Sequence, residues 1–155
     1  MTFEQLASDF YGFENGLTDQ EKAHLAQLRE YLETEVKPIV NDHWNRAEFP
    51  REIVAGLAKH GATGLAWEET RPFENSAVFR GWVAVELGRI DASVSTYIGV
   101  QNGLAMGAIA ACGSAEQRAE WLPKLNSGEL IGAFGLTEPL SGSDSAQGLR
   151  TTAKR

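Results

Sequence analysis

The feature that most constrains the fold is a long run without charge, from Ala92 to Ala115. About 20 apolar residues suffice to cross a bilayer, so a membrane span has to be considered. The run, however, contains several hydroxyl and amide side chains and is otherwise rich in glycine and alanine. Gly99, Gly103 and Gly107 recur every fourth residue, a spacing that lets helices approach closely. The run therefore predicts a crowded central helix beside other helices or a ligand, and no membrane span.

Composition narrows the class of protein. At 155 residues the chain is long enough for one hydrophobic core. A net charge of −7, with no cluster of Lys or Arg, argues against nucleic acid as a partner. The aromatic-rich stretch 1–16 predicts either a short helix or an arm that packs on a partner. It lacks a basic region followed by an apolar run, so we expect no signal peptide and a cytoplasmic location.

The cysteine and histidine residues indicate neither a disulfide nor a metal site. Cys112 is the single cysteine, which excludes a disulfide framework and a cysteine-based metal site. Its apolar neighbours predict a small buried residue. His24, His43 and His60 lack the spacing of metal ligands and are expected at surface or helix-cap positions. No metal site is therefore predicted.

Cap residues and apolar spacing divide the first 128 residues into helices. Thr18 and Glu21 form a capping box that opens a helix, and Pro38 is expected to kink or end it. Glu86 and Arg89 stand three residues apart and could pair, although an exposed pair is worth only about 0.3 to 0.5 kcal/mol. The other predicted helices cover 49–61, 74–90, the uncharged run, and the stretch opened by a second capping box at Ser114 and Gln117.

A different pattern begins after residue 128. Leu130 to Leu136 is a short apolar run consistent with a buried strand, which Pro139 is expected to end. The loop from Leu140 to Ser145 is rich in hydroxyl groups and small residues, and its N–H groups could hold an anion such as phosphate. An ordinary strand and turn is the alternative. Leu149 to Arg155 suggests the start of a second strand.

Gly135-Leu136-Thr137-Glu138-Pro139, two spacers and Gly142-Ser143-Asp144 together resemble the first signature of the acyl-CoA dehydrogenases. The third residue after Asp144 is usually small in that pattern; here it is Gln147, followed by Gly148, which predicts a longer turn. Further stretches resemble the helical N-terminal domain of the family, most of all its glutaryl-CoA dehydrogenase-like branch: Tyr97–Gln101, Gly113–Arg118, Trp121–Pro123 and Gly128–Glu129.

The resemblance implies a mainly α fold with two parts. An N-terminal α-helical domain would occupy 1–128, and 129–155 would be the start of the middle β-domain with its first strand or strands. Less than half of the family's usual length is present, so the chain is expected to be an N-terminal portion of the enzyme.

The resemblance also implies FAD as the cofactor. The strand backbone around Phe134 and Leu136, together with Thr137, would meet the flavin ring. Gly142 and Ser143 would face the phosphate and ribityl part of FAD, and Ser143 would also touch the acyl-CoA.

For the acyl pocket, the resemblance nominates Tyr97, Val100 and Leu104 on the uncharged helix, with plain core packing as the alternative. Glutaryl-CoA dehydrogenases bind the far carboxylate of their substrate with an arginine and a serine. Those positions fall at Ser95 and Gly99 here, so the resemblance favours an uncharged acyl chain.

In this family a glutamate removes the α-proton of the acyl-CoA and hydride leaves the β-carbon for the flavin. That glutamate is expected beyond Arg155, so no residue here is assigned as the base, Glu138 included. The intact enzyme is expected to be a homo-oligomer that reduces an acceptor such as an electron-transfer flavoprotein, whereas these 155 residues alone should be inactive. The alternatives are an acyl-CoA oxidase or flavin monooxygenase of the same fold, and a helical interaction module without catalysis.

Overall fold

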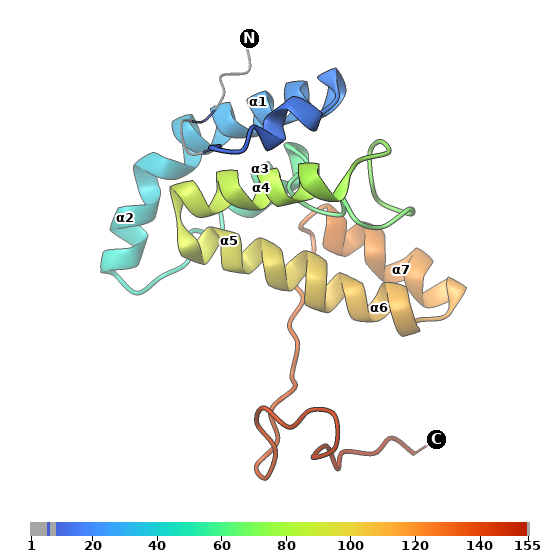
Figure 1. The fold of residues 1–155 in the computed structure, drawn as a ribbon. Helices are drawn as coiled ribbons and strands as arrows, with labels where there is room; N and C mark the ends of the chain where they lie inside the picture. The colour runs from blue at the N-terminus through green and yellow to red at the C-terminus, as the bar shows by residue number, and fades with distance from the viewer. Residues whose placement is uncertain (1–5, 7–8, 155) are drawn as a thin grey trace.

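The computed structural model describes residues 6 and 9–154, and within them the chain is mainly helical (Figure 1). The predicted fold class is confirmed. The helices are α1 (Asp19–Tyr31), α2 (Lys37–Asn45), α3 (Ile53–Lys59), α4 (Ala77–Ile90), α5 (Ala92–Gly99), α6 (Gly107–Cys112) and α7 (Ala115–Asn126). A 3-10 turn covers Phe13–Gly16, and π-helical turns cover Leu32–Val36 and Val100–Met106. Of the expected helix or arm at 1–16, residues 1–5, 7 and 8 lie outside the described part.

Residues 13–126, which we call the helical body, are helices and the loops that join them. The π-helical turns join α1 to α2 and α5 to α6, so each pair forms one long helix. In Figure 1, α4 lies between α1 and the α5–α6 helix, and α7 lies beside α6. The main core lies among these helices and contains Leu25, Leu28, Leu32, Leu57, Phe79, Leu87 and Val94, whereas a smaller core holds Met106, Leu122 and Leu125.

Local sequence determines where several helices begin. Both capping boxes form: Thr18 with Glu21 at α1, and Ser114 with Gln117 at α7. In each, a side-chain oxygen accepts a hydrogen bond from an N–H group of the first turn that has no partner within the helix. The helices predicted to start at 49 and 74 begin instead at Ile53 and Ala77, after turns.

Pro38 does not end the first long helix. A π-helical turn directly precedes it, in which the Lys37 N–H donates to the Leu32 carbonyl. Pro38 then follows as the second residue of α2, and the changed hydrogen-bond spacing of the π-helical turn accommodates a residue that has no N–H group. The expected break is thus replaced by a wider turn within a continuing helix.

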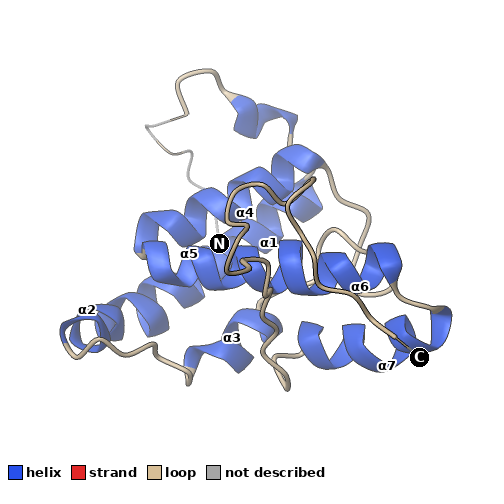
Figure 2. Cartoon of the chain, turned by 90° about the horizontal axis from the view of Figure 1, so that it is seen from below, coloured by secondary structure: helices blue, strands red, loops and turns tan. Residues whose placement is uncertain are grey.

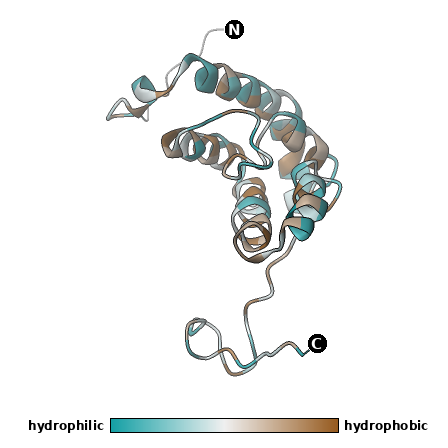
Figure 3. Ribbon diagram, turned by 90° about the vertical axis from the view of Figure 1, so that its right-hand side faces the viewer, coloured by the Kyte–Doolittle hydropathy of each residue, from teal (hydrophilic) through white to brown (hydrophobic). Residues whose placement is uncertain are grey.

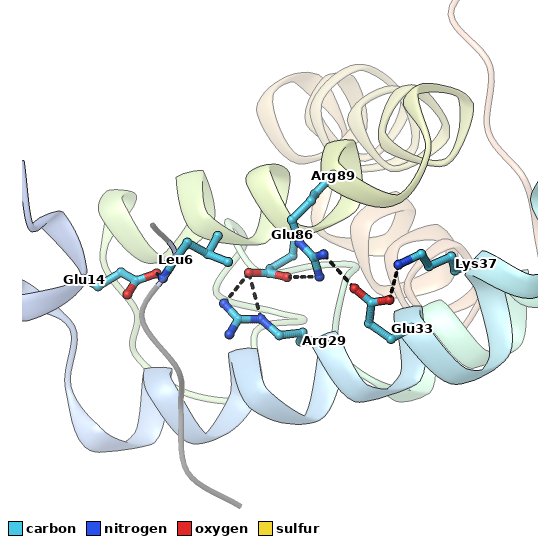
Figure 4. Close-up of polar contacts among 7 residues, drawn as sticks. All are labelled: Leu6, Glu14, Arg29, Glu33, Lys37, Glu86 and Arg89. Atoms are coloured by element: carbon cyan, nitrogen blue, oxygen red, sulfur yellow. Dashed lines mark hydrogen bonds and ion pairs between the residues drawn. The ribbon is translucent and has the colours of Figure 1, made fainter. Parts of the chain in front are cut away.

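The pair within α4 is part of a network that is centred on a buried glutamate and reaches the first long helix (Figure 4). The Glu86 side chain is fully buried, and its two oxygens accept from Arg29 at 2.6 Å and from Arg89 at 3.2 Å. Arg89 continues to Glu33, which also binds Lys37. Sequence spacing showed only the pair within α4, because Arg29 lies 57 residues away.

Cys112 is exposed at the end of α6, so its predicted burial is wrong. An apolar stretch can lie on the surface at a helix terminus, and neighbours in sequence do not decide burial there. His24 belongs to α1, and its half-buried side chain reaches the end of α3. Its Nε2 lies 3.1 Å from the Gly61 carbonyl oxygen, which agrees with a position that caps a helix end. Among the described helices, none is long and apolar enough to cross a membrane.

Residues 130–154, which we call the C-terminal segment, form no paired strand within the described part (Figures 2 and 3). The expected strand over Leu130–Leu136 is an extended stretch, and residues 149–154 of the second expected strand are irregular. The segment contains an isolated bridge between Glu138 and Ser141. A strand needs a partner for its backbone groups, and the helical body offers none. The division into two domains near residue 128 stays a prediction.

Candidate functional site

The C-terminal segment leaves the helical body in direct contact with the long α5–α6 helix. The Gly132 N–H donates to the Gln101 side chain, in the π-helical turn that joins α5 to α6. A Cβ atom on Gly132 would lie 2.3 Å from the Ala105 Cβ, so only glycine fits this approach. The segment is therefore fixed to the helix at this point.

Beyond this contact the segment is open. Phe134 and Leu136 are 45% and 37% exposed, and Thr137 is exposed as well. Within the described residues, the N–H groups of 133–137 have no backbone partner. An extended stretch with free N–H and C=O groups can bind a flat polar ring along its edge, as the predicted role of Phe134, Leu136 and Thr137 requires.

The loop after Pro139 is organised by Glu138. Its backbone forms two hydrogen bonds with Ser141, at 2.9 and 3.1 Å. Its carboxylate accepts from the N–H groups of Arg150 and Thr151, at 2.8 and 3.0 Å. Hydrogen bonds from Thr151 and Arg150 lower the pKa of the Glu138 carboxyl. A carboxylate that is ionised and accepts two hydrogen bonds is a poor proton acceptor. This agrees with not assigning Glu138 as a base.

Within this loop the two other predicted cofactor residues point to free space. A Cβ atom on Gly142 would meet no other atom within 4 Å, and Ser143 is exposed. Gly148 is tightly placed instead, because a Cβ there would lie 2.3 Å from the Ser141 hydroxyl. The loop thus leaves Gly142 and Ser143 accessible to a ligand.

The predicted substrate residues differ in their surroundings. Leu104 is 45% exposed and Val100 is half-buried. Tyr97 packs with the main core, its ring centre 5.3 Å from that of Phe49, and burial raises the pKa of its phenol. Leu104 is thus the most accessible of the three to an acyl chain.

The glycines of the central helix are less crowded than predicted. Cβ atoms on Gly99 and Gly103 would meet nothing within 4 Å, whereas one on Gly107 would lie 3.4 Å from the Trp67 ring. The described residues therefore bring no other helix close to Gly99 and Gly103, a feature that a spacing of four residues could not show, and the alternative of a ligand beside them stays a prediction. Along these two residues the helix leaves open space.

Some residues of the site were not found from the sequence. Gln101, which holds the start of the C-terminal segment, is fully buried although its neighbours in sequence gave no sign of a polar partner. Glu138 was part of a motif, but its hydrogen bonds to Arg150 and Thr151 depend on how the loop folds back. The Gly142-to-Gly148 stretch, rich in small and polar residues, was the signal for such a turn.

The helical body belongs to a known class of helical domains. Residues 18–129 match the family model of the acyl-CoA dehydrogenase N-terminal domain. The chain therefore belongs to the acyl-CoA dehydrogenase family, as its sequence motifs predicted.

Relatives of the chain span several members of that family. It is 33% identical over 138 residues to an acyl-CoA dehydrogenase of Bacillus subtilis, covering 88% of this chain and 36% of the relative. It is 32% identical over 130 residues to a short-chain-specific acyl-CoA dehydrogenase of Clostridium acetobutylicum, covering 83% and 34%. The chain thus spans about a third of the length of these relatives.

Solved structures show the same fold. Glutaryl-CoA dehydrogenase from Mycobacterium smegmatis matches with a TM-score of 0.84 and 37% identity, over 98% of this chain and 39% of that one. A second structure of a glutaryl-CoA dehydrogenase from that organism, in complex with FADH2, matches with a TM-score of 0.82 and 34% identity, over 92% and 37%.

Proposed function

We propose that this chain supplies the helical domain and the first flavin-contacting segment of an FAD-dependent acyl-CoA dehydrogenase. The observation that carries the proposal is the extended stretch 133–137, which leaves the helical body at Gly132 with its backbone groups free. Family membership and the FADH2 complex of a relative support FAD as the ligand of that stretch.

The residues fit the cofactor in two ways. The stretch containing Phe134, Leu136 and Thr137 is open for a planar ring, and the loop exposes Gly142 and Ser143 where a phosphate could approach closely. When bound, FAD supplies the acceptor for a hydride from the acyl β-carbon. This chain orients the ring through the Thr137 hydroxyl and neighbouring backbone, and its helical surface at Val100 and Leu104 excludes water from the acyl chain.

We assign no catalytic base to this chain. Glu138 is held by two N–H groups, and its carboxyl has a lowered pKa. The base belongs to the part of the enzyme that the relatives have in addition, and we expect the 155 residues alone to be inactive. An electron-transfer flavoprotein as acceptor and a homo-oligomeric enzyme are further parts of this proposal.

The substrate is an uncharged acyl-CoA rather than glutaryl-CoA. A carboxylate buried in the acyl pocket needs a cation, because an unpaired charge away from water is very costly. The helix that faces the pocket has no charged residue from Ala92 to Ala115, and Ser95 and Gly99 stand at the two positions that would bind the carboxylate. The similarity to glutaryl-CoA dehydrogenases thus extends to the fold and not to this specificity.

The test is an assay of the enzyme that contains this chain. It should retain FAD on purification. Its kcat/KM for butyryl-CoA should be higher than that for glutaryl-CoA by a factor on the order of 10². Ser95→Arg should reduce this ratio of kcat/KM values. A protein without flavin would refute the proposed function, rapid peroxide formation would indicate an oxidase, and equal rates on the two substrates would refute only the specificity.

A further inference from the structure

Gln101 is the side chain that connects the central helix to the C-terminal segment. It is fully buried. Its Nε2 donates to the carbonyl oxygens of Leu125 at 2.7 Å and Leu130 at 2.9 Å, and its Oε1 accepts from the Gly132 N–H at 2.8 Å. Both donor hydrogens of the amide are used and its oxygen is bonded as well. One side chain thus binds the end of α7 and the first residues of the C-terminal segment.

The neighbouring residue, Asn102, connects the same helix to a different part of the chain. The Asn102 side chain accepts from the Gly64 N–H at 3.0 Å and donates to the Ala62 carbonyl at 2.9 Å. The Trp67 indole donates to the Asn102 carbonyl at 3.2 Å. Gln101 and Asn102 both lie in the π-helical turn Val100–Met106. Such turns inside α-helices are frequently found at functional sites.

The contact at Gly132 determines how closely the C-terminal segment approaches the α5–α6 helix. A Cβ on Gly132 would lie 2.3 Å from the Ala105 Cβ and 3.3 Å from Leu125 Cδ2. Gly132 stands two residues before Phe134 and five before Thr137. The hydrogen bond from Gln101 and the close approach to Ala105 therefore determine where the open stretch begins, relative to Val100 and Leu104 on the same helix.

We propose that Gln101 is a positioning residue that fixes the flavin-contacting stretch against the acyl-facing helix. The inference rests on the proposed function and adds a residue to it. Gln101 is buried and acts through Gly132, so it touches neither ligand. Its role is to keep the distance between the flavin edge and the acyl chain constant, because a misplacement of about 1 Å can cost on the order of 10² in rate.

The test compares Gln101→Met with Asn102→Leu in the FAD-loaded enzyme. Each variant replaces an amide by an apolar side chain of similar size and leaves main-chain groups without their partners. Both should lower the unfolding temperature. Only Gln101→Met should shift the flavin absorption spectrum and lower kcat, by up to about 100-fold. Asn102→Leu should keep the wild-type spectrum and kcat, because it anchors residues 62–67 and not the C-terminal segment.

A second pair of variants tests the same positioning without removing a hydrogen-bonding side chain. Gly132→Ala should push the segment off the helix and reproduce the spectral shift and the loss in kcat. Adding Ala105→Gly removes the opposing methyl group and should restore both, with Ala105→Gly alone as the control. If Gln101→Met does not fold, these two variants still test the positioning role.

Three results are informative. A wild-type spectrum and kcat in both Gln101→Met and Gly132→Ala would overturn the positioning role while leaving the proposed function intact. Equal losses in Gln101→Met and Asn102→Leu, without rescue of Gly132→Ala by Ala105→Gly, would also overturn it. Wild-type enzyme without bound FAD would refute the proposed function itself.

Discussion

The helical body and the C-terminal segment differ in what holds them. The body buries a continuous set of apolar side chains, such as Leu25, Leu28 and Phe79, between helices whose backbone groups pair within each helix. In the described part of the segment, Ser141 is the single buried residue, and several large apolar side chains are exposed. Helices satisfy their hydrogen bonds locally, whereas strands need partners. The body therefore pairs its backbone groups and buries its apolar side chains within itself, whereas most of the segment's backbone groups and side chains are exposed.

The largest effect expected from this difference is a contrast between two phenylalanines. Phe79→Ala in α4 removes a fully buried ring and should lower the free energy of unfolding by about 3 to 5 kcal/mol. Phe134→Ala removes a ring that is 45% exposed and should change it by less than about 0.5 kcal/mol. Urea denaturation followed by circular dichroism measures both. A comparable loss in the two variants would show that the segment is part of the cooperative unit.

A second contrast compares two glutamates that each accept from two groups. Glu86→Gln removes a buried charge from between Arg29 and Arg89, which should cost about 3 kcal/mol. Glu138→Gln acts on an exposed loop and should leave the denaturation midpoint unchanged, although it loses a bond to Arg150 or Thr151. Glu86→Gln with wild-type stability would mean that the network between α1 and α4 contributes nothing net.

A third test removes one hydroxyl from the segment. Thr137→Val keeps the shape of the side chain, so the stability of the helical body should not change. In the flavin-loaded enzyme it should weaken FAD binding by about 0.5 to 1.5 kcal/mol, the usual value of one hydrogen bond. Flavin fluorescence titration measures the change, with Thr152→Val at an exposed position of the same segment as the control. Unchanged affinity and absorbance would show that Thr137 does not face the flavin.

The smallest effect concerns pH and the helical body alone. Burial lowers the pKa of His24 below 6.5. Below pH 6.5 the unfolded chain therefore takes up a proton that the folded His24 resists, so its contribution to stability is full above that pH and is lost as the pH falls toward the folded pKa. Thermal unfolding between about pH 5 and 7.5 should show a shallower acid loss in His24→Gln than in the wild type. Parallel pH profiles would contradict this assignment.

The sequence by itself determined the features that depend on near neighbours. The capping boxes at Thr18 and Ser114 form as predicted, because each closes within four residues. Gly61 ends its helix with a positive φ of 68°, a conformation that favours glycine. The family was also readable, because its motifs, such as the signature after Phe134, are continuous stretches of sequence; the match over residues 18–129 shows the same family.

Only the tertiary structure decided the features that join distant residues. Glu86 is buried because Arg29 reaches it from α1, and Gln101 is buried because α7 and the C-terminal segment surround it. Leu130 to Leu136 has the composition of a strand, but pairing depends on partners that local sequence cannot supply. Helical hydrogen bonds close over a few residues, whereas burial and strand pairing are set by whatever the folded chain brings alongside.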